Sequence, residues 1–333
     1  MARFSPSALA RAALGSALLC FWLLGLAAPA EERKPFQAAL LSPGPISDAG
    51  WNATAYEALK RIEKELGAKI SQVETKTPSE FEESFRTFGE KGYDIVFGHG
   101  FEYQDPADHL HNEYPKTVFI VTAGVAAREP NVAPLVINID EPAYLCGYLA
   151  GLMSKTGIAG CVGGMELPGV KQSFEGFRLG FQTAKPGGQV LTGYVGNWED
   201  AGAAKEAAKA QIQKGAEFIF HNADAAGLGI FQAVKEAKDK SVYAFGCIKD
   251  QNAVLPDRVL ASAVVDIPGA MVEAAKLVSA GKFKARPLEL GVANGQATLV
   301  LNPKLKDSIP KAAREKLEQA RRRIVEGKVA FKR

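Results

Sequence analysis

The sequence is poor in the residues that carry enzyme chemistry. Only four histidines and four cysteines occur among its 333 residues. It has no GxSxG, CxxC, HExxH or GxxxxGK motif, which are signatures of hydrolases, thiol redox proteins, zinc proteases and phosphate-binding loops. We therefore predict no catalytic site and no cofactor, and we rank an exported α/β enzyme well behind a binding protein.

One group of side chains could be considered for a metal. His109 and His111 lie near His99 and Asp108 in the sequence. A helix is expected at residues 106–113, and it turns side chains two positions apart roughly 200° away from each other. We therefore predict that this group does not form a metal site.

The sequence also has no large excess of positive or negative charge. The formal net charge is +3, and it falls to +1 without the first thirty residues, whose only charges are Arg3 and Arg11. Acids and bases are interspersed, so nothing predicts nucleic-acid binding. The basic run 321–323 is interpreted as the solvated face of a helix.

Only one long apolar run is present, and it lies at the start of the chain. Arg3 and Arg11 precede the apolar segment 12–28, which ends at Ala28-Pro29-Ala30, an A-x-A cleavage site. This pattern predicts a signal peptide over 1–30 and a periplasmic protein. An uncleaved anchor is disfavoured because the run is short. A lipoprotein anchored at Cys20 is disfavoured because no small residue precedes it.

Cysteine is too scarce for a disulfide framework. After export, Cys146, Cys161 and Cys247 remain. They could form at most one disulfide, and buried free thiols are an equal alternative. Stability is therefore expected to come from the core.

What the sequence does have is a repeated alternation of strands and helices, which predicts parallel sheets. Strands are expected at 36–41, 68–73, 93–98, 116–122, 135–139, 157–163, 190–195, 218–221, 242–245 and 259–265. One helix is expected to carry Ala55, Leu59, Ile62 and Leu66 on its apolar face, and further helices are expected at 78–91, 143–154, 169–183, 200–214, 225–238 and 268–280.

The series restarts at residues 138–142, where acids and a proline follow a strand. This predicts two similar lobes. Lobe 1 comprises 31–139 plus about 266–300, lobe 2 comprises 140–265, and the hinge lies near 138–141 and 265–268. Around Asn294-Gly295, residues 288–300 could pair as two strands. The segment 301–333 carries a surface helix over 311–327 that buries Ala313, Leu317, Ala320 and Ile324.

The stretch 40–67 organises the first lobe. A buried strand, a Pro/Gly/Ser turn and a helix follow one another, with Ser47 or Asp48 as the expected N-cap. Trp51 and Asn52 then fall in the first helical turn, at the carboxyl end of the strand, where α/β sheets bind ligands. A Trp51 that only covers the core is the alternative.

Two more aromatic residues follow predicted strands. Phe101 comes after Gly98-His99-Gly100, and Trp198 comes after the strand ending at Val195. With Trp51 they could face one crevice between the lobes. Two rings on either side of a planar ligand contribute roughly 1–3 kcal/mol per stack.

Several stretches, in this order, resemble one family over nearly all of the mature chain. They are 44–59, 98–102 (GHGFE), 146–151 (CGYLAG), 174–177 (FEGF), 198–200 (WED) with 207–208, 214–217 (KGAE), 227–229 (GLG) and 250–251 (DQ). The sequence is similar to the basic membrane protein family, the purine-nucleoside-receptor-like substrate-binding proteins of ABC importers.

This resemblance implies a type I periplasmic-binding fold, with two Rossmann-like lobes that close on a ligand. In relatives that bind purine nucleosides an aromatic from each lobe stacks on the base, and these positions match Trp51 and Trp198. The complete predicted ligand-binding set is Asp48, Trp51, Asn52, Phe101, Trp198, Asn222, Asp224 and Asp250.

The sequence departs from nucleoside binders at two positions. Ile248 stands where they carry an aspartate, and Val265 stands where a lysine is expected. Missing polar partners would cost a nucleoside roughly 1–3 kcal/mol each. A nucleobase or another flat heteroaromatic ligand is therefore expected.

The predicted function is a monomeric periplasmic receptor that delivers a small molecule to an inner-membrane ABC permease and ATPase. A receptor that signals to a membrane sensor kinase is the alternative, and neighbouring genes would discriminate the two.

Overall fold

The computed structural model describes residues 1, 34–48, 50–238 and 241–332. The predicted signal peptide, with Cys20, lies outside the described residues apart from Met1. Phe36–Arg333 forms one compact unit. Among the described residues, no helix combines the length and the apolar character needed to cross a bilayer.

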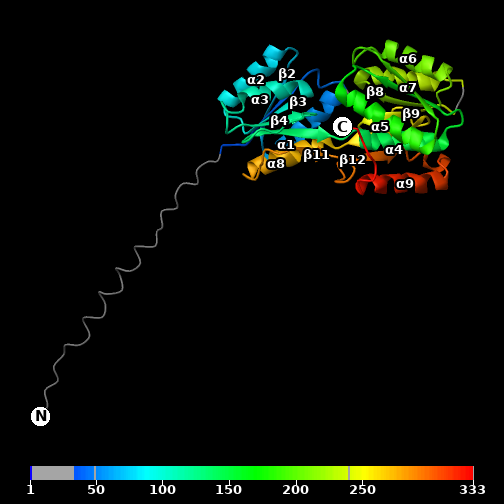
Figure 1. Ribbon diagram of the computed structural model, residues 1–333. Coiled ribbons are helices and arrows are strands. Elements are labelled where there is room, and N and C mark those ends of the chain that lie inside the picture. The colour runs from blue at the N-terminus through cyan, green and yellow to red at the C-terminus, as the bar shows by residue number, and fades with distance from the viewer. Residues whose placement is uncertain (2–33, 49, 239–240, 333) are drawn as a thin grey trace. The chain divides into compact units, whose positions relative to one another are not determined.

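The first lobe is built on a six-stranded sheet in the order β11-β5-β4-β3-β1-β2 (Figure 1). All neighbouring strands are parallel. The strands are β1 (Gln37–Ser42), β2 (Lys69–Glu74), β3 (Ile95–His99), β4 (Val118–Thr122), β5 (Val132–Ile137) and β11 (Leu288–Leu290).

Helices cover both faces of this sheet. One face packs against α1 (Trp51–Leu66) and α8 (Ile267–Ser279), and the other against α2 (Pro78–Glu90) and α3 (Gln104–Leu110), which follows the 3-10 turn η1 (Phe101–Tyr103). Successive residues of a strand point to opposite faces. Phe97 accordingly joins the core under α1, while Val96 joins the core under α2 and α3.

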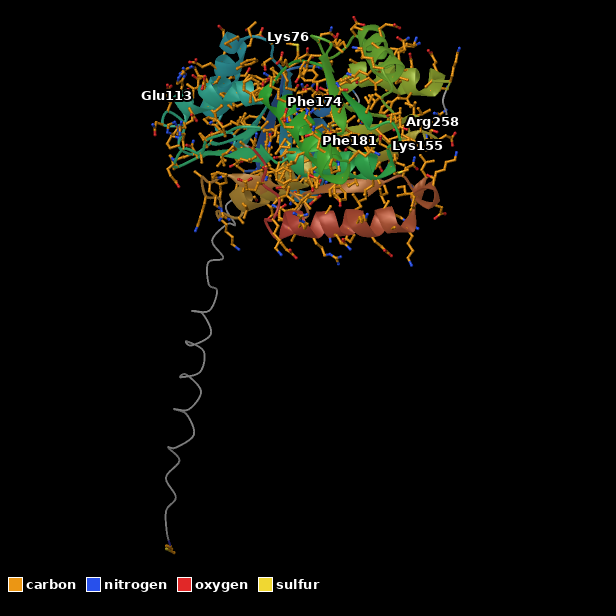
Figure 2. All side chains as sticks on the ribbon, turned by 45° about the vertical axis from the view of Figure 1, so that its right-hand side comes forward. Lys76, Glu113, Lys155, Phe174, Phe181 and Arg258 are labelled. Atoms are coloured by element: carbon orange, nitrogen blue, oxygen red, sulfur yellow. The ribbon has the colours of Figure 1, made fainter. Side chains whose placement is uncertain are left out.

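The second lobe repeats the plan with the order β12-β10-β9-β8-β6-β7. Its strands are β6 (Ile158–Gly163), β7 (Gln189–Tyr194), β8 (Phe218–Asn222), β9 (Tyr243–Ile248), β10 (Val259–Val265) and β12 (Ala297–Leu301). Its helices are α4 (Asp140–Met153), α5 (Pro168–Ala184), α6 (Ala201–Gln213) and α7 (Gly227–Glu236), with the 3-10 turn η2 (Asp224–Ala226) before α7. Phe174 and Phe181 of α5, labelled in Figure 2, are buried in its core. The predicted two-lobed α/β fold is confirmed.

Helices α4 and α5 pack unusually closely because each presents glycine to the other. A Cβ on Gly147 would lie 1.9 Å from the Phe177 carbonyl oxygen, and one on Gly180 would lie 2.0 Å from that of Tyr144. Any larger residue would force the helices apart.

The predicted strand pair at 288–300 is wrong. The turn at Asn294 and Gly295 exists, but β11 pairs with β5 of the first sheet and β12 pairs antiparallel with β10 of the second. Because each strand finds a partner in a different lobe, this turn is a third crossover between the lobes. Residues 297–300, which we expected in lobe 1, therefore belong to the second sheet.

Helix α9 (Lys311–Val325), preceded by the 3-10 turn η3 (Lys306–Ser308), follows β12. Its four predicted buried residues, Ala313, Leu317, Ala320 and Ile324, are all buried. The helix packs against α4 of the second lobe. The three cysteines of the folded unit are free and buried, and burial raises the pKa of each thiol.

Candidate functional site

The amino end of α1 is held by the carboxylate of Asp48. The helix begins at Trp51 after Gly50, so the residue at the cap position is Gly50 rather than Ser47 or Asp48. Asp48 nevertheless accepts hydrogen bonds from the backbone N–H groups of Gly50 (3.0 Å), Asn52 (2.8 Å) and Ala53 (2.9 Å). A carboxylate here also interacts favourably with the helix dipole.

Trp51 is fixed by a reciprocal contact with His99, the last residue of β3. The two rings stack with centroids 4.1 Å apart. The indole Nε1 donates to the His99 carbonyl at 3.2 Å, and the His99 Nε2 lies 3.0 Å from the Trp51 carbonyl. Burial lowers the pKa of His99 to about 4, so the imidazole is neutral at pH 7. The indole itself is only half-buried and stays accessible in part.

Three buried polar atoms without a hydrogen-bond partner lie on the first turn of α1 and at the carboxyl ends of β3 and β4. Among the described residues they are Asn52 Oδ1, His99 Nδ1 and Thr122 Oγ1. His99 and Thr122 are register partners at the carboxyl ends of β3 and β4, so their side chains lie on the same face of the sheet. Because the Trp51 carbonyl can only accept, His99 Nε2 carries the proton and Nδ1 is an acceptor. Buried polar atoms are normally paired, so this group is suited to hydrogen-bonding a small polar molecule.

Asp224 brings the second lobe to the same place. It follows β8 and adopts a left-handed φ of 43°. It lies against the residues that begin α1, because a Cβ added to Gly50 would be 2.9 Å from its Oδ1 and 3.7 Å from its Cα. Burial and the Asp48 carboxylate raise the pKa of Asp224 to about 7.

Trp198 lies beside the segment that carries Asp224. Its carbonyl accepts from the N–H of Ala226 at 2.8 Å. Its indole lies against Gly164, where an added Cβ would be 2.3 Å from Cε3, so only glycine leaves room for the ring. Nearby, Asn222 donates from Nδ2 to Ser173 Oγ at 3.2 Å.

Backbone strain is concentrated at the same edges. Among the described residues, the non-glycine positions with positive φ are Ala123 (57°), Asp224 (43°) and Ile248 (69°). They lie at or just after the carboxyl ends of β4, β8 and β9. Such conformations cost of order 1–3 kcal/mol each and cluster at functional sites.

The Asp-Gln pair is divided between surface and interior. Asp250 is exposed and its Oδ1 accepts from the Asn252 N–H at 2.9 Å. Gln251 turns inward, where its Oε1 lies 2.9 Å from both His221 Nε2 and the Cys247 N–H. Burial lowers the pKa of His221 to about 4. Gln251 thus links the end of β9 to His221, whereas Asp250 stabilises a turn at the surface.

The structure therefore joins five of the eight predicted residues through direct or adjacent contacts, namely Asp48, Trp51, Asn52, Trp198 and Asp224. Asn222 lies at the end of the strand just before Asp224. Phe101 is 46% exposed at the start of η1, and Asp250 is at the surface.

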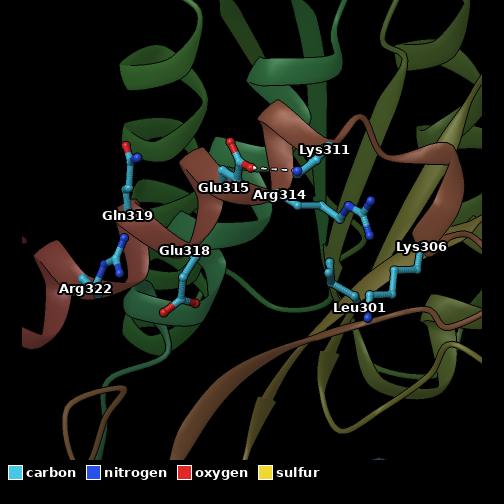
Figure 3. Close-up of a pocket in the computed structure, with 8 residues that line it drawn as sticks. All are labelled: Leu301, Lys306, Lys311, Arg314, Glu315, Glu318, Gln319 and Arg322. Carbon is cyan, nitrogen blue, oxygen red and sulfur yellow. Dashed lines mark ion pairs between the residues drawn. The ribbon is translucent and has the colours of Figure 1, made fainter.

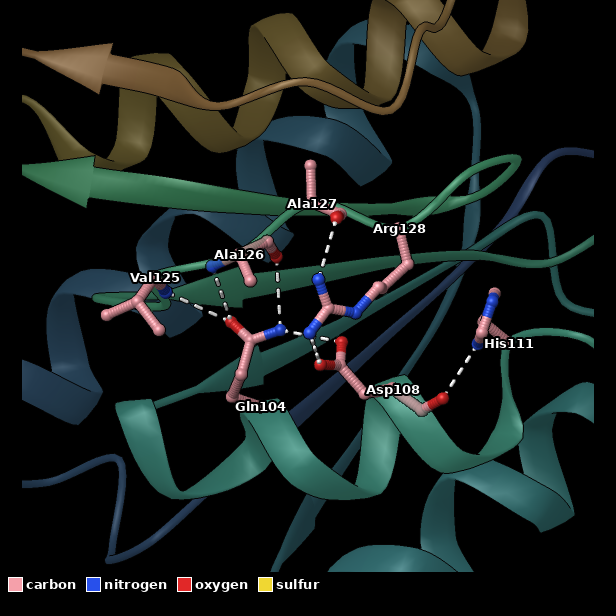
Figure 4. A network of polar contacts seen from close by, with 7 residues as sticks. All are labelled: Gln104, Asp108, His111, Val125, Ala126, Ala127 and Arg128. Carbon is pink, nitrogen blue, oxygen red and sulfur yellow. Dashed lines mark hydrogen bonds and ion pairs between the residues drawn. The ribbon is translucent and has the colours of Figure 1, made fainter.

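The loop after β4 is anchored by Gln104 (Figure 4). Its Oε1 accepts from the N–H of Val125 at 3.0 Å, and its Nε2 donates to the Ala126 carbonyl at 3.1 Å and to Asp108 Oδ1 at 2.8 Å. Asp108 also pairs with Arg128 at 2.9 Å. The group we considered for metal binding thus contributes to holding a loop at the edge of the site.

A separate groove of about 600 Å³ lies along α9 (Figure 3). It is lined by Leu301, Lys306, Lys311, Arg314, Glu315, Glu318, Gln319 and Arg322. Leu301 pairs with Ala261, near the beginning of β10. This groove is therefore at the opposite edge of the second sheet from the strand ends described above, and it is not the candidate site.

Residues 36–330 match a family model described as "ABC transporter substrate-binding protein PnrA-like". The chain belongs to this family. The resemblance inferred from the sequence motifs is thereby confirmed, and the chain is a substrate-binding protein of an ABC transporter.

Relatives of this PnrA-like protein have informative names. A purine-binding protein of Brucella abortus is 29% identical over 297 residues, covering 88% of this chain and 83% of its own length. An ABC transporter nucleoside-binding protein of Lactococcus lactis is 24% identical over 306 residues, covering 85% of each. A solute-binding protein of Aeropyrum pernix shares the fold with a TM-score of 0.80 at 22% identity, covering 90% of this chain and 93% of its own.

Sequence reasoning missed the roles of His99, Thr122 and Gly164 in this PnrA-like protein. His99 was considered only as a metal ligand. A polar residue that ends an otherwise apolar strand, as His99 and Thr122 both do, was the available signal. No local pattern marks Gly164, because its role is set by an indole more than thirty residues later.

Proposed function

We propose that this protein is the periplasmic receptor of an ABC importer and that it binds a purine-type nucleobase between its two lobes. The observation that carries the proposal is the meeting of both lobes at one helix end. There a half-buried indole lies next to buried hydrogen-bond acceptors from α1 and β3.

The side chains around the amino end of α1 suit a flat ligand with N–H donors. Trp51 and Trp198 are held from behind, by His99 and Gly164 respectively, so each offers a positioned ring. Asn52 Oδ1 can accept from ring or exocyclic N–H groups. The names of the Brucella and Lactococcus relatives support a purine.

A nucleobase is favoured over a nucleoside. Ile248 and Val265 are 8% and 2% exposed and offer a ribose no polar group. A site built to hydrogen-bond a ligand hydroxyl loses its selectivity when the polar partner is absent. We therefore expect bases to bind at least as tightly as their nucleosides.

The receptor is proposed to act as a monomer, to release its ligand chemically unchanged, and to hand it to a membrane permease driven by an ATPase. Closure of the lobes around the ligand would use the three crossovers, at 138–141, 265–268 and 291–296.

Isothermal titration calorimetry with adenine, hypoxanthine, guanine, adenosine, inosine and glucose tests the proposal. Glucose is included because a relative of Haloferax volcanii, 29% identical over 217 residues, is named as a putative glucose-binding protein. Saturable binding of at least one purine is expected, and mass spectrometry of the released ligand should show an unaltered mass. No purine binding, or binding of glucose alone, would overturn the proposal.

Two variants test the site itself. Trp51→Ala and Trp198→Ala should each weaken purine binding by about tenfold or more, which corresponds to ~1.4 kcal/mol. Tyr56→Ala is a matched control, because this aromatic also lies on α1 but further from the amino end at which the lobes meet. It should lower the melting temperature and leave affinity unchanged. If the tryptophan variants behave like the control, these rings do not contact the ligand.

A further inference from the structure

Two carboxyl groups from different lobes share the amino end of α1. Asp48, in the first lobe, accepts from the N–H groups of Gly50, Asn52 and Ala53. Asp224 of the second lobe lies at the same helix end, where a Cβ added to Gly50 would be 2.9 Å from its Oδ1 and 3.7 Å from its Cα. Carboxyl groups of both lobes thus approach Gly50, and they do so only when the lobes are together.

The surroundings of Asp224 contain no compensating cation among the described groups that act on it. Asp48 is the nearby charge, and it is of the same sign. His99 lies behind Trp51 and is kept neutral by burial, and the neighbouring thiol of Cys247 is kept protonated by burial. Bringing an ionised Asp224 up to Asp48 is therefore opposed by like-charge repulsion and by desolvation.

We propose that Asp224 is a latch whose protonated carboxyl docks on the amino end of α1, so that closing the two lobes takes up one proton. The part of this inference that concerns ligand affinity rests on the proposed function, because a ligand held between the lobes binds the closed form. The part that concerns closure does not depend on any ligand.

The direction of the pH dependence follows from the difference in proton binding between the open and the closed forms. With the lobes apart, Asp224 is solvated and has a carboxyl pKa near its ordinary value of 3.8, whereas in the closed form the pKa is about 7. Between these two values the closed form binds more protons than the open form. Closure should therefore weaken about tenfold for each unit of rising pH between about 5 and 6.5, and should change little above about 7.5.

Small-angle X-ray scattering of the ligand-free protein from pH 5 to pH 8 tests the latch. The wild-type radius of gyration should increase as the pH rises toward 7. Asp224→Asn keeps the size and polarity of the side chain but carries no charge, so it should stay compact across the whole range. Asp224→Gly suits the left-handed backbone and removes the carboxyl, so it should be expanded and insensitive to pH.

Asp257→Asn is the matched control, because this aspartate of the same lobe is exposed and pairs with Lys304. It should follow the wild-type curve. If wild type and Asp224→Asn give superimposable curves, whether flat or sloped, the latch is overturned. If the scattering series behaves as expected but no purine binds at pH 5.5 or pH 8, the latch stands and the proposed ligand fails.

Discussion

Gly164 sets the position of the Trp198 indole, and adding one methyl group there should displace the ring. In Gly164→Ala the new Cβ would lie 2.3 Å from Cε3, 2.6 Å from Cζ3 and 2.9 Å from the Asn197 carbonyl oxygen. Ordinary contacts of a Cβ are 3.4–4 Å. The six-membered part of the indole must therefore move by about 1 Å, a displacement that can cost up to a hundredfold where geometry matters.

The expected loss of purine affinity is ten- to a hundredfold, or about 1.4–2.8 kcal/mol. Overpacking in a closed core costs typically 1–3 kcal/mol of stability, and the cost here should be near the lower limit because the half-buried indole can move outward. Affinity should therefore fall more than the free energy of unfolding. Titration calorimetry and urea denaturation measure the two quantities on the same samples.

Gly169→Ala is the matched control, since it adds the same methyl group in the same lobe where nothing lies within 4 Å. It should leave affinity unchanged. Trp198→Phe, a smaller ring, should rescue part of the lost affinity when combined with Gly164→Ala. Wild-type affinity in Gly164→Ala, or the absence of any rescue in the double variant, would refute the reasoning that this glycine positions a ligand-binding ring.

Three further predictions concern stability. Burial lowers the pKa of His99 and His221 to about 4, so below pH 6.5 the unfolded chain binds more protons than the folded chain and acidification destabilises the fold. The free energy of unfolding should therefore fall between pH 6.5 and pH 4.5, and His221→Gln should reduce that fall by about 2 kcal/mol in urea titrations. A variant with an unchanged loss would contradict this. Glu141 accepts from the Val292 N–H at 2.6 Å and ties two crossovers together, so Glu141→Ala should cost about 1.5–3 kcal/mol and Glu141→Gln, which keeps an acceptor, clearly less. Equal losses in both would count against the bond. If the buried face of α9 unfolds together with the rest of the protein, Leu317→Ala should lower the free energy of unfolding by about 2–4 kcal/mol, as measured by calorimetry. A separate transition at lower temperature would show that α9 unfolds on its own.

The sequence by itself determined the elements and the fold class. Hydrophobic periodicity, proline at helix starts and glycine at helix ends are local signals, and the buried face of α1 through Ala55, Leu59 and Ile62 and that of α9 follow from them. The motifs of the PnrA-like family were likewise readable along the chain, because their order is a property of the sequence.

Only the tertiary structure decided how distant elements meet. The turn at Asn294 and Gly295 looks like a hairpin, yet its two strands separate because each finds a better partner in a different lobe. Asp224 reaches the amino end of α1 only because the second sheet places it there. Long-range pairing, shared hydrogen bonds and the burial that shifts a pKa depend on the packed fold as a whole, and no local pattern of residues encodes them.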